Sequence, residues 1–278
     1  MNHHSETEKK AASLPASARL PVNRCNIPPV IVGSLRFQQH PVPIEIDNIK
    51  TLHADLFRKL DEIDEPCERA ERFQDYMTVH FVLHQLDEAG ATKKTKRRKA
   101  NYLRMVRGWF FDANSREGAV LKSWVESRFG LLTRFHHGPM HQGENGCYHR
   151  FLHDRSTGLY GTNALEAQLD LLYSYCQYEM ERQLPDQTHI KLYRGINRLD
   201  EHEVLHEGEK RCNQVLLNNL NSFTSERDRA DEFGDYILEA EIPKQKIMFY
   251  ANLIPGCLNG EDEHLVIGGV YEVKIKSF

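Results

Sequence analysis

The sequence predicts an α+β fold in which a helical N-terminal half packs on a mostly antiparallel β C-terminal half. Before Pro185, apolar residues recur every three or four positions, which places them on one face of a helix. After Pro185 they gather in short runs bounded by Gly, Asn and Pro, as is typical of strands. We therefore expect a disordered tail at residues 1–20, a mainly helical region at 21–185 and a β-rich core at 186–278.

The composition argues against several classes of protein. Forty per cent of the 278 residues are hydrophobic and 27% are charged, a balance typical of globular domains. The net charge of −4 gives no reason to expect nucleic acid or a membrane surface as a partner. The apolar runs are far shorter than the ~20 residues of a membrane span, and the first twenty residues contain no apolar core of a signal peptide. We expect a cytoplasmic protein.

Cysteine and histidine patterns give no metal centre. The six cysteines are scattered without a Cys-x-x-Cys pair, which favours free thiols over a disulfide framework or a zinc site. No His-x-x-x-His pair occurs beside a suitably placed acid on a clear helix, and a metal at the glycine-flanked cluster of His136, His137 and His141 is the less favoured alternative. We expect no bound metal.

Five helices are expected in the N-terminal half, and each follows from its apolar stripe. The last one opens at Asn163, where Asn163 and Glu166 form a capping-box pattern, and it ends before Pro185. The prolines at 28 and 29 oppose a helix, so residues 30–32 and 44–46 are expected as short strands or coil. Residues 134–155, rich in His, Gly and Asn, are expected as a long loop. The five stripes cover residues 49–60, 70–86, 102–110, 119–125 and 165–180.

The C-terminal half is expected to contain six strands and one short helix. Ser225 is expected to begin that helix and Gly234 to end it. No internal repeat, Gly-x-Gly-x-x-Gly motif or Gly-Lys-Ser/Thr loop occurs, so a nucleotide would bind without those phosphate cradles. The expected strands cover residues 190–196, 216–222, 236–242, 247–250, 264–267 and 270–275.

Two acids, Glu261 and Glu263, stand two residues apart immediately ahead of the expected strand at 264–267. If they open this strand, their side chains share one face, because strand side chains alternate. Two neighbouring carboxylates repel each other, so the pair would bind a cation or divide the roles of acid and base. An isolated Glu-x-Glu is also common as a solvated strand end.

Three short motifs stand at the ends of expected strands, in the order Arg, Ser, Glu along the chain. They are residues 192–195 (Leu-Tyr-Arg-Gly), 221–225 (Asn-Ser-Phe-Thr-Ser) and 261–263 (Glu-Asp-Glu). This order resembles the Arg–Ser–Glu motifs of the cholera-toxin-like mono-ADP-ribosyltransferases. Longer phrases resemble one family within that group, the ADP-ribosyltransferases that modify dinitrogenase reductase, the nitrogenase iron protein, in nitrogen-fixing bacteria. The resemblance covers about residues 20 to 275. The matching sequence segments are 23–29, 33–38, 116–122, 124–130, 158–166, 231–234 and 260–269.

The resemblance implies a split, mostly antiparallel ADP-ribosyltransferase core whose cleft binds NAD as a substrate without a Rossmann fold. Glu263 would stabilise the oxocarbenium-like state that forms when the nicotinamide–ribose bond breaks, and would hold the ribose 2′-hydroxyl. Glu261 would orient an acceptor arginine and take its proton, because a protonated guanidinium is not a nucleophile. Arg194 would bind the pyrophosphate.

Other residues of the motifs receive binding roles by the same resemblance. Gly195 would leave a backbone group open to the nicotinamide amide. The serine motif departs from a strict Ser-Thr-Ser: either Ser222 or Thr224 hydrogen-bonds the catalytic Glu, with Ser222 preferred, while Ser225 lines the cleft or caps the next helix. The loop at 253–260 would contact the partner.

The resemblance further implies the partners. The acceptor is one arginine of the nitrogenase iron protein, whose modification reversibly inactivates nitrogen fixation, and a PII-type nitrogen-signalling protein with ADP is the activator. Two alternatives stay open: an NAD glycohydrolase that uses water as acceptor, and a non-catalytic NAD-binding regulatory module. The basic run at 93–99 is a solvated loop or a docking surface for an acidic partner.

Overall fold

The computed structural model describes residues 13–83, 101–140, 146–160, 162, 164–197, 203–208, 212–256 and 262–277. The basic run at 93–99, Asn163 and Glu261 lie outside the described residues. The fold is α+β, as the sequence predicts, with helices in the N-terminal half and an antiparallel sheet in the C-terminal part. The helices are α1 (Pro29–Val32), α2 (Leu35–Gln39), α3 (Ile49–Leu52), α4 (Ala54–Asp61), α5 (Pro66–His80), α6 (Tyr102–Phe111), α7 (Arg116–Phe129), α8 (Gly146–Leu159), α9 (Leu165–Gln183) and α10 (Arg227–Asp231).

The strands form a sheet that closes on itself. They are β1 (His189–Ile196), β2 (Glu203–Glu207), β3 (Cys212–Thr224), β4 (Tyr236–Pro243), β5 (Ile247–Tyr250) and β6 (Glu263–Ser277). Their order is β2-β3-β1-β4-β6-β5, and β3 also pairs with β6, so β3, β1, β4 and β6 form a closed ring. The ring is split between β1 and β3, because these two strands pair only at Tyr193 and Thr224.

A second divergence lies between β4 and β6 and is filled by a side chain from α2. The ladder between these strands runs from Tyr236↔Ser277 to Glu239↔Lys274. Beyond it, the Gln38 amide nitrogen donates to the carbonyl oxygens of Glu241 and Glu272 at 3.0 and 3.1 Å. The Gln38 amide oxygen accepts from the Glu272 backbone N–H at 2.7 Å. Buried backbone groups must be hydrogen-bonded, so Gln38 replaces the missing ladder contacts.

Strand β6 is continuous, which corrects the prediction of two strands at 264–267 and 270–275. Opposite Gly268 and Gly269, strand β3 carries an irregularity between Leu217 and Leu220. A Cβ atom on Gly268 would lie 1.6 Å from the carbonyl oxygen of Asn218, so only glycine fits this close approach. The glycine pair therefore accommodates a bulge instead of ending the strand.

The bulge connects the sheet to the segment that follows α7. The buried Asn219 side-chain nitrogen donates to the carbonyl oxygens of Lys122 and Leu131 at 2.8 and 3.2 Å, and to Thr133 Oγ1 at 3.1 Å. The neighbouring Asn218 Oδ1 accepts from the Arg134 backbone N–H at 2.9 Å. Helix α7 is thereby fixed against β3.

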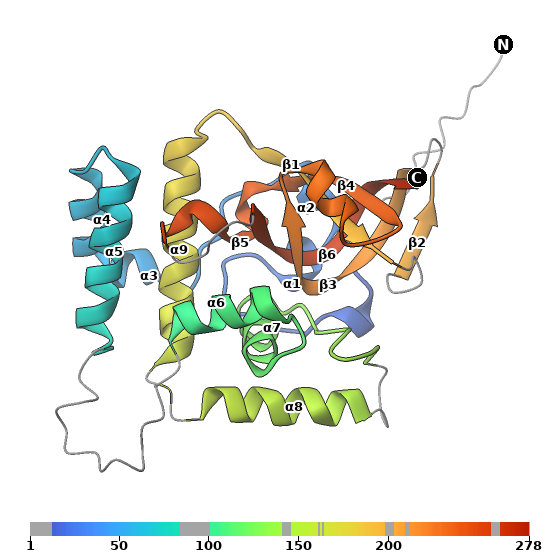
Figure 1. Cartoon of the computed structure of the whole chain (residues 1–278), viewed down its shortest axis with the longest axis horizontal. Coiled ribbons are helices and arrows are strands. Elements are labelled where there is room, and N and C mark those ends of the chain that lie inside the picture. The colour runs from blue at the N-terminus through green and yellow to red at the C-terminus, as the bar shows by residue number, and fades with distance from the viewer. Residues whose placement is uncertain are drawn as a thin grey trace.

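Helix α9 lies between the α4–α5 pair and the sheet (Figure 1). Its residues are buried nearly all round, including Leu169, Leu172 and Cys176, as expected of a core helix. On the α5 side, the buried carboxylate of Glu179 accepts from Arg69 Nε and Nη2 at 2.7 and 2.8 Å. Helices α6, α7 and α8 lie beneath the sheet in the view of Figure 1.

Several local predictions are wrong. Residues 134–155 contain the greater part of α8, whose buried Phe151 and Asp154 face the core, so the segment is not a continuous loop. Residues 30–32 lie in the short helix α1, where Pro29 occupies the first helical position that tolerates proline. Helix α5 ends at His80, earlier than the expected Leu86. Strand β2, a largely exposed edge strand, was not predicted.

Lys246 is buried between α1 and the bulge. Its Nζ donates to the carbonyl oxygens of Val32 and Gly268 at 2.7 and 2.6 Å. Burial lowers its pKa from 10.5 to about 7. Between pH 7 and pH 10.5, Lys246 is protonated in the unfolded chain but not in the folded protein. The destabilisation caused by burying Lys246 is therefore greatest below pH 7 and decreases as the pH rises.

We predict that the wild-type protein gains stability relative to Lys246→Met as the pH rises above neutral. The free energy of unfolding of the wild type minus that of the variant should increase by up to about 1.4 kcal/mol per pH unit. Urea unfolding at about pH 7 and about pH 8.5, below the ordinary cysteine pKa of 9.0, measures this difference. Parallel pH profiles for the two proteins would show that Lys246 does not titrate in this range.

Candidate active site

A cavity of about 360 Å³ lies at the split between β1 and β3. Its wall contains five of the residues that the sequence singled out: Arg194, Gly195, Ser222, Thr224 and Glu263. Ser225 is exposed, and the lining of this cavity does not include it. The partner acid Glu261 lies outside the described residues, although its neighbour Asp262 stands in the wall.

Arg194 spans the split. Its Nη1 donates to the backbone carbonyl oxygen of Ser222 at 2.8 Å, just where β1 and β3 stop pairing. The guanidinium thereby satisfies a backbone group that a continuous ladder would have satisfied, and it holds one edge of the cavity. This arrangement places a permanent cation beside the serine motif, where it can bind an anionic ligand.

The two hydroxyl groups of the serine motif have different surroundings. Ser222 Oγ accepts from the indole Nε1 of Trp109 at 2.9 Å. Thr224 is paired directly with Glu263 across β3 and β6, so their side chains share a face of the sheet. Thr224 Oγ1 also accepts from the Glu226 backbone N–H at 3.1 Å. The position opposite Glu263 is thus that of Thr224, and the preference for Ser222 as the hydrogen-bond partner of Glu263 stays a prediction.

Thr224 also shapes the entry to α10. The N-cap of this helix is Glu226, with no side-chain cap, and the helix ends at Asp231. The prediction that Ser225 caps the helix and Gly234 ends it is therefore wrong. The turn made by Thr224 brings α10 onto the cavity, whose wall includes Arg229 and Ala230 of this helix and Phe233 just beyond it.

Gly195 is required by the packing of α10 on β1. A Cβ atom at this position would lie 2.0 Å from the Ala230 carbonyl oxygen and 3.0 Å from Phe233 Cβ. No side chain fits so close to backbone, and glycine therefore allows the helix to close this side of the cavity. The expected contact of the Gly195 backbone with nicotinamide stays a prediction.

The end of α6 forms a wall that the sequence did not predict. Trp109, Phe110, Phe111, Asp112 and Ala113 all line the cavity. Their signal in the sequence is three successive aromatic residues, since one face of a helix cannot bury three in a row. Trp109 is buried and Phe111 is 94% exposed, so the run passes from the core to the mouth of the site.

A second cavity of about 470 Å³ adjoins the first, and the two share Trp109, Ala113, Arg194 and Ser222. Its wall also includes Lys122 and Arg134. Lys122 is buried, and its Nζ donates to the Phe135 carbonyl oxygen at 3.0 Å and to Asn114 Oδ1 at 3.3 Å. Burial lowers the pKa of Lys122 to about 7.

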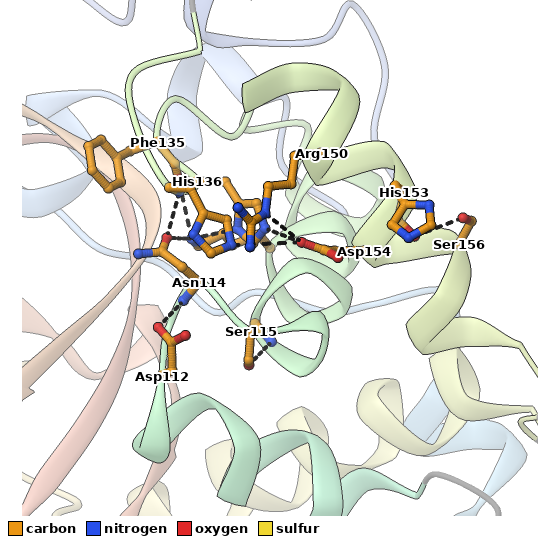
Figure 2. A network of polar contacts seen from close by, with 12 residues as sticks. Asp112, Asn114, Ser115, Phe135, His136, Arg150, His153, Asp154 and Ser156 are labelled. Atoms are coloured by element: carbon orange, nitrogen blue, oxygen red, sulfur yellow. Dashed lines mark hydrogen bonds and ion pairs between the residues drawn. The ribbon is translucent and has the colours of Figure 1, made fainter. Parts of the chain in front are cut away.

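A polar network connects Lys122 with His136 and Asp154, and Figure 2 shows His136 beside Asn114 and Phe135. The Lys122 ammonium lies 3.4 Å from His136 Nδ1, and His136 Nε2 lies 3.3 Å from Asp154 Oδ2. Burial, followed by the charge of Lys122, lowers the pKa of His136 to about 4, so this imidazole is neutral near pH 7. Asn114 Oδ1 accepts from the His137 backbone N–H at 3.0 Å. The network thus anchors Lys122 of α7 through groups on α8, on the segment between α7 and α8, and on the turn that precedes α7.

His136, His137 and Asp154 could each offer a ligand atom to a metal ion, within 4.8 Å of one another. Cationic side chains flank this group on two sides. Arg150 Nε lies 3.7 Å from Asp154 Oδ2, and Lys122 lies beyond His136. Figure 2 shows Asp154 on the far side of His136 from Asn114, next to Arg150. The carboxylate is already paired with positive charge and with imidazole.

We predict that Gly195→Ala lowers stability, because the new methyl group would displace either α10 or β1. Overpacking against backbone costs about 1–3 kcal/mol or more, so the melting temperature should fall by several degrees. Gly146→Ala is the matched control, since a Cβ atom there meets nothing within 4 Å. Equal melting temperatures for Gly195→Ala and the wild type would contradict the close approach.

Comparison with known proteins identifies the family. The sequence model described as dinitrogenase reductase ADP-ribosyltransferase (DRAT) matches residues 22–275. The NAD(+)--dinitrogen-reductase ADP-D-ribosyltransferase of Rhodospirillum rubrum is 38% identical over 260 residues, which cover 91% of this chain and 93% of that protein. No solved structure matches the chain. The resemblance seen in the sequence is confirmed, and the chain belongs to the dinitrogenase reductase ADP-ribosyltransferase family.

Proposed function

We propose that this chain transfers the ADP-ribose group of NAD to an arginine side chain of dinitrogenase reductase and releases nicotinamide. The observation that carries the proposal is the convergence of Arg194, Ser222, Thr224 and Glu263 on one cavity at the split of the sheet. The family, and the activity for which the relative from Rhodospirillum rubrum is named, support NAD as the donor and dinitrogenase reductase as the acceptor.

The proposed reaction breaks the bond between the nicotinamide nitrogen and C1′ of the ribose, and the bonding electrons leave with nicotinamide. Positive charge develops on the ribose, and the Glu263 carboxylate stabilises it at the mouth of the cavity. A guanidinium nitrogen of the acceptor then forms a bond to C1′ and loses a proton, for which Glu261 is our candidate base. Arg194 holds the diphosphate and bridges the split between β1 and β3.

The remaining parts of the chain receive roles in the same proposal. Residues 186–278 form the catalytic core, and residues 21–185 cover it and contact partners. NAD is a substrate, and we propose no metal in the transfer, since the His136–Asp154 group lies outside the walls of both cavities. The mouth carries the exposed Asp262 beside Glu263, which favours a cationic acceptor.

Regulation and location complete the proposal. We propose that a PII-type signalling protein with ADP activates the enzyme, and that modification reversibly inactivates nitrogen fixation in the cytoplasm. Among the helices of the described residues, none has the length and apolar character of a membrane span. Residues 93–99 remain our candidate docking surface for an acidic partner.

The test follows radiolabelled ADP-ribose and free nicotinamide together, with NAD, dinitrogenase reductase and the ADP-bound PII-type protein. We predict that Glu263→Gln slows both nicotinamide release and protein labelling by about 10²–10³-fold, because it removes the charge that stabilises the ribose. Glu261→Gln should slow labelling by about 10²–10⁴-fold and leave nicotinamide release largely intact.

Glu272→Gln is the matched control, an exposed acid farther along β6, and should behave as the wild type. Nicotinamide release without labelled protein, in the wild type, would favour an NAD glycohydrolase. Binding of NAD without any turnover would favour a non-catalytic module, and either outcome would overturn the transferase proposal.

A further inference from the structure

We propose that the second cavity binds the diphosphate and adenosine half of NAD, and that Lys122 from the helical region is its buried anion-binding residue. The inference rests on the proposed function, because Glu263 places the reacting nicotinamide ribose in the first cavity. The continuous wall formed by Trp109, Arg194 and Ser222 supports it. A dinucleotide whose nicotinamide half occupies the first cavity can pass Arg194 and extend into the second.

Lys122 is a buried cation that faces a cavity. Its exposed fraction is 2%, and its nearest polar partners are uncharged: the Phe135 carbonyl oxygen, Asn114 Oδ1 and His136 Nδ1. Among the described residues, no carboxylate lies within ion-pair distance of its Nζ. The Asp112 carboxylate acts on Lys122 only from beyond ion-pair distance, so the buried charge is costly and an anionic ligand would reduce that cost.

The other charges of the second cavity are consistent with a diphosphate. Arg194 and Arg134 also stand in its wall, and Arg134 forms an ion pair with Glu203 of β2. Lys122 and Arg194 both stand in this wall, and Asp112, whose charge raises the pKa of Lys122, lines the first cavity and not the second. Arg194 lines both cavities, whereas Lys122 lines only the second. A diphosphate that bridges two such cations gains charge-assisted contacts at both phosphates.

The rest of this wall suits a planar base. Its apolar surface comes from Phe135, Pro139, Met140, Leu216 and Leu220. Nucleotide sites combine such a surface with a few polar groups that fix orientation. The bulge residue Asn218 supplies a side-chain amide within the same lining. The second cavity thus offers what the adenosine diphosphate half of NAD requires.

A second buried lysine provides the internal comparison. Lys246 is also buried against carbonyl oxygens, but it lies between the rings of Phe37 and Tyr271 and lines neither of the two cavities. Removal of its charge alters the core without touching the proposed site. Lys122 and Lys246 therefore form a matched pair, one in the cavity and one outside it.

The experiment measures dissociation constants by calorimetry for NAD, ADP-ribose and nicotinamide riboside, which lacks phosphate and adenosine. For Lys122→Met we expect binding of NAD and ADP-ribose to weaken by about tenfold to 100-fold, with nicotinamide riboside unchanged. Lys122→Arg should restore part of the affinity because it keeps the charge. Lys246→Met should leave all three constants unchanged, and melting curves confirm that each variant is folded.

A second variant keeps the inference testable if Lys122→Met does not fold. Met140 is half-buried in the wall of the second cavity, and Met140→Trp would fill that cavity. We expect this variant to weaken the binding of NAD and ADP-ribose but not the binding of nicotinamide riboside. Unchanged NAD affinity in both variants would overturn the proposed site, even if the wild type labels dinitrogenase reductase normally. Equal weakening of NAD and nicotinamide riboside in both would also overturn it, since the defect would then be general. Absence of labelling by a wild type that binds ADP-ribose through Lys122 would instead overturn the transferase proposal alone.

Discussion

The contact between the Arg194 guanidinium and the Ser222 carbonyl oxygen sets the geometry of the candidate site. A closed ring of four strands would ordinarily bury its interior with side chains, leaving no room for a ligand. Here β1 and β3 pair only at Tyr193 and Thr224, and the arginine takes over where the ladder stops. One cation therefore keeps the sheet together and presents positive charge to both cavities. A neutral side chain of the same length would leave the split without either function.

The helices complete a site that the sheet only begins. Strand β3 carries Ser222 and Thr224, and β6 carries Glu263, but Trp109 of α6 closes the space behind Ser222. The bulge opposite Gly268 fixes α7 to the same strand through Asn219, which holds Lys122 at the second cavity. On the opposite side of the ring, Gln38 of α2 fills the divergence between β4 and β6. The helical region is thus part of the site as well as its cover.

The sequence predicted what depends on local pattern. The stripe of α9 and the runs of β1, β4 and β5 follow periodicity, and the motif residues Arg194 and Glu263 stand in one cavity as the family resemblance implied. Features that depend on contacts between residues far apart in the sequence could not be predicted. The role of Gly268 is set by Asn218 across the sheet, so the glycine pair gave the false impression of a strand break. Trp109 had the pattern of an ordinary core residue, because its partner Ser222 is 113 positions away. Helix α8 was missed since its polar, histidine-rich sequence has only a narrow buried stripe.

The central claim is that NAD occupies the cavities walled by Trp109, and the protein's two tryptophans allow a direct measurement. Fluorine NMR of protein containing fluorotryptophan should give one resonance for Trp109 and one for Trp124, assigned with a Trp124→Phe variant. Trp124 is buried away from both cavities, where its Nε1 donates to Asp170. We predict that NAD shifts the Trp109 resonance in a saturable manner and does not shift the Trp124 resonance. A Trp109 resonance that does not move at saturating NAD would show that the dinucleotide binds elsewhere.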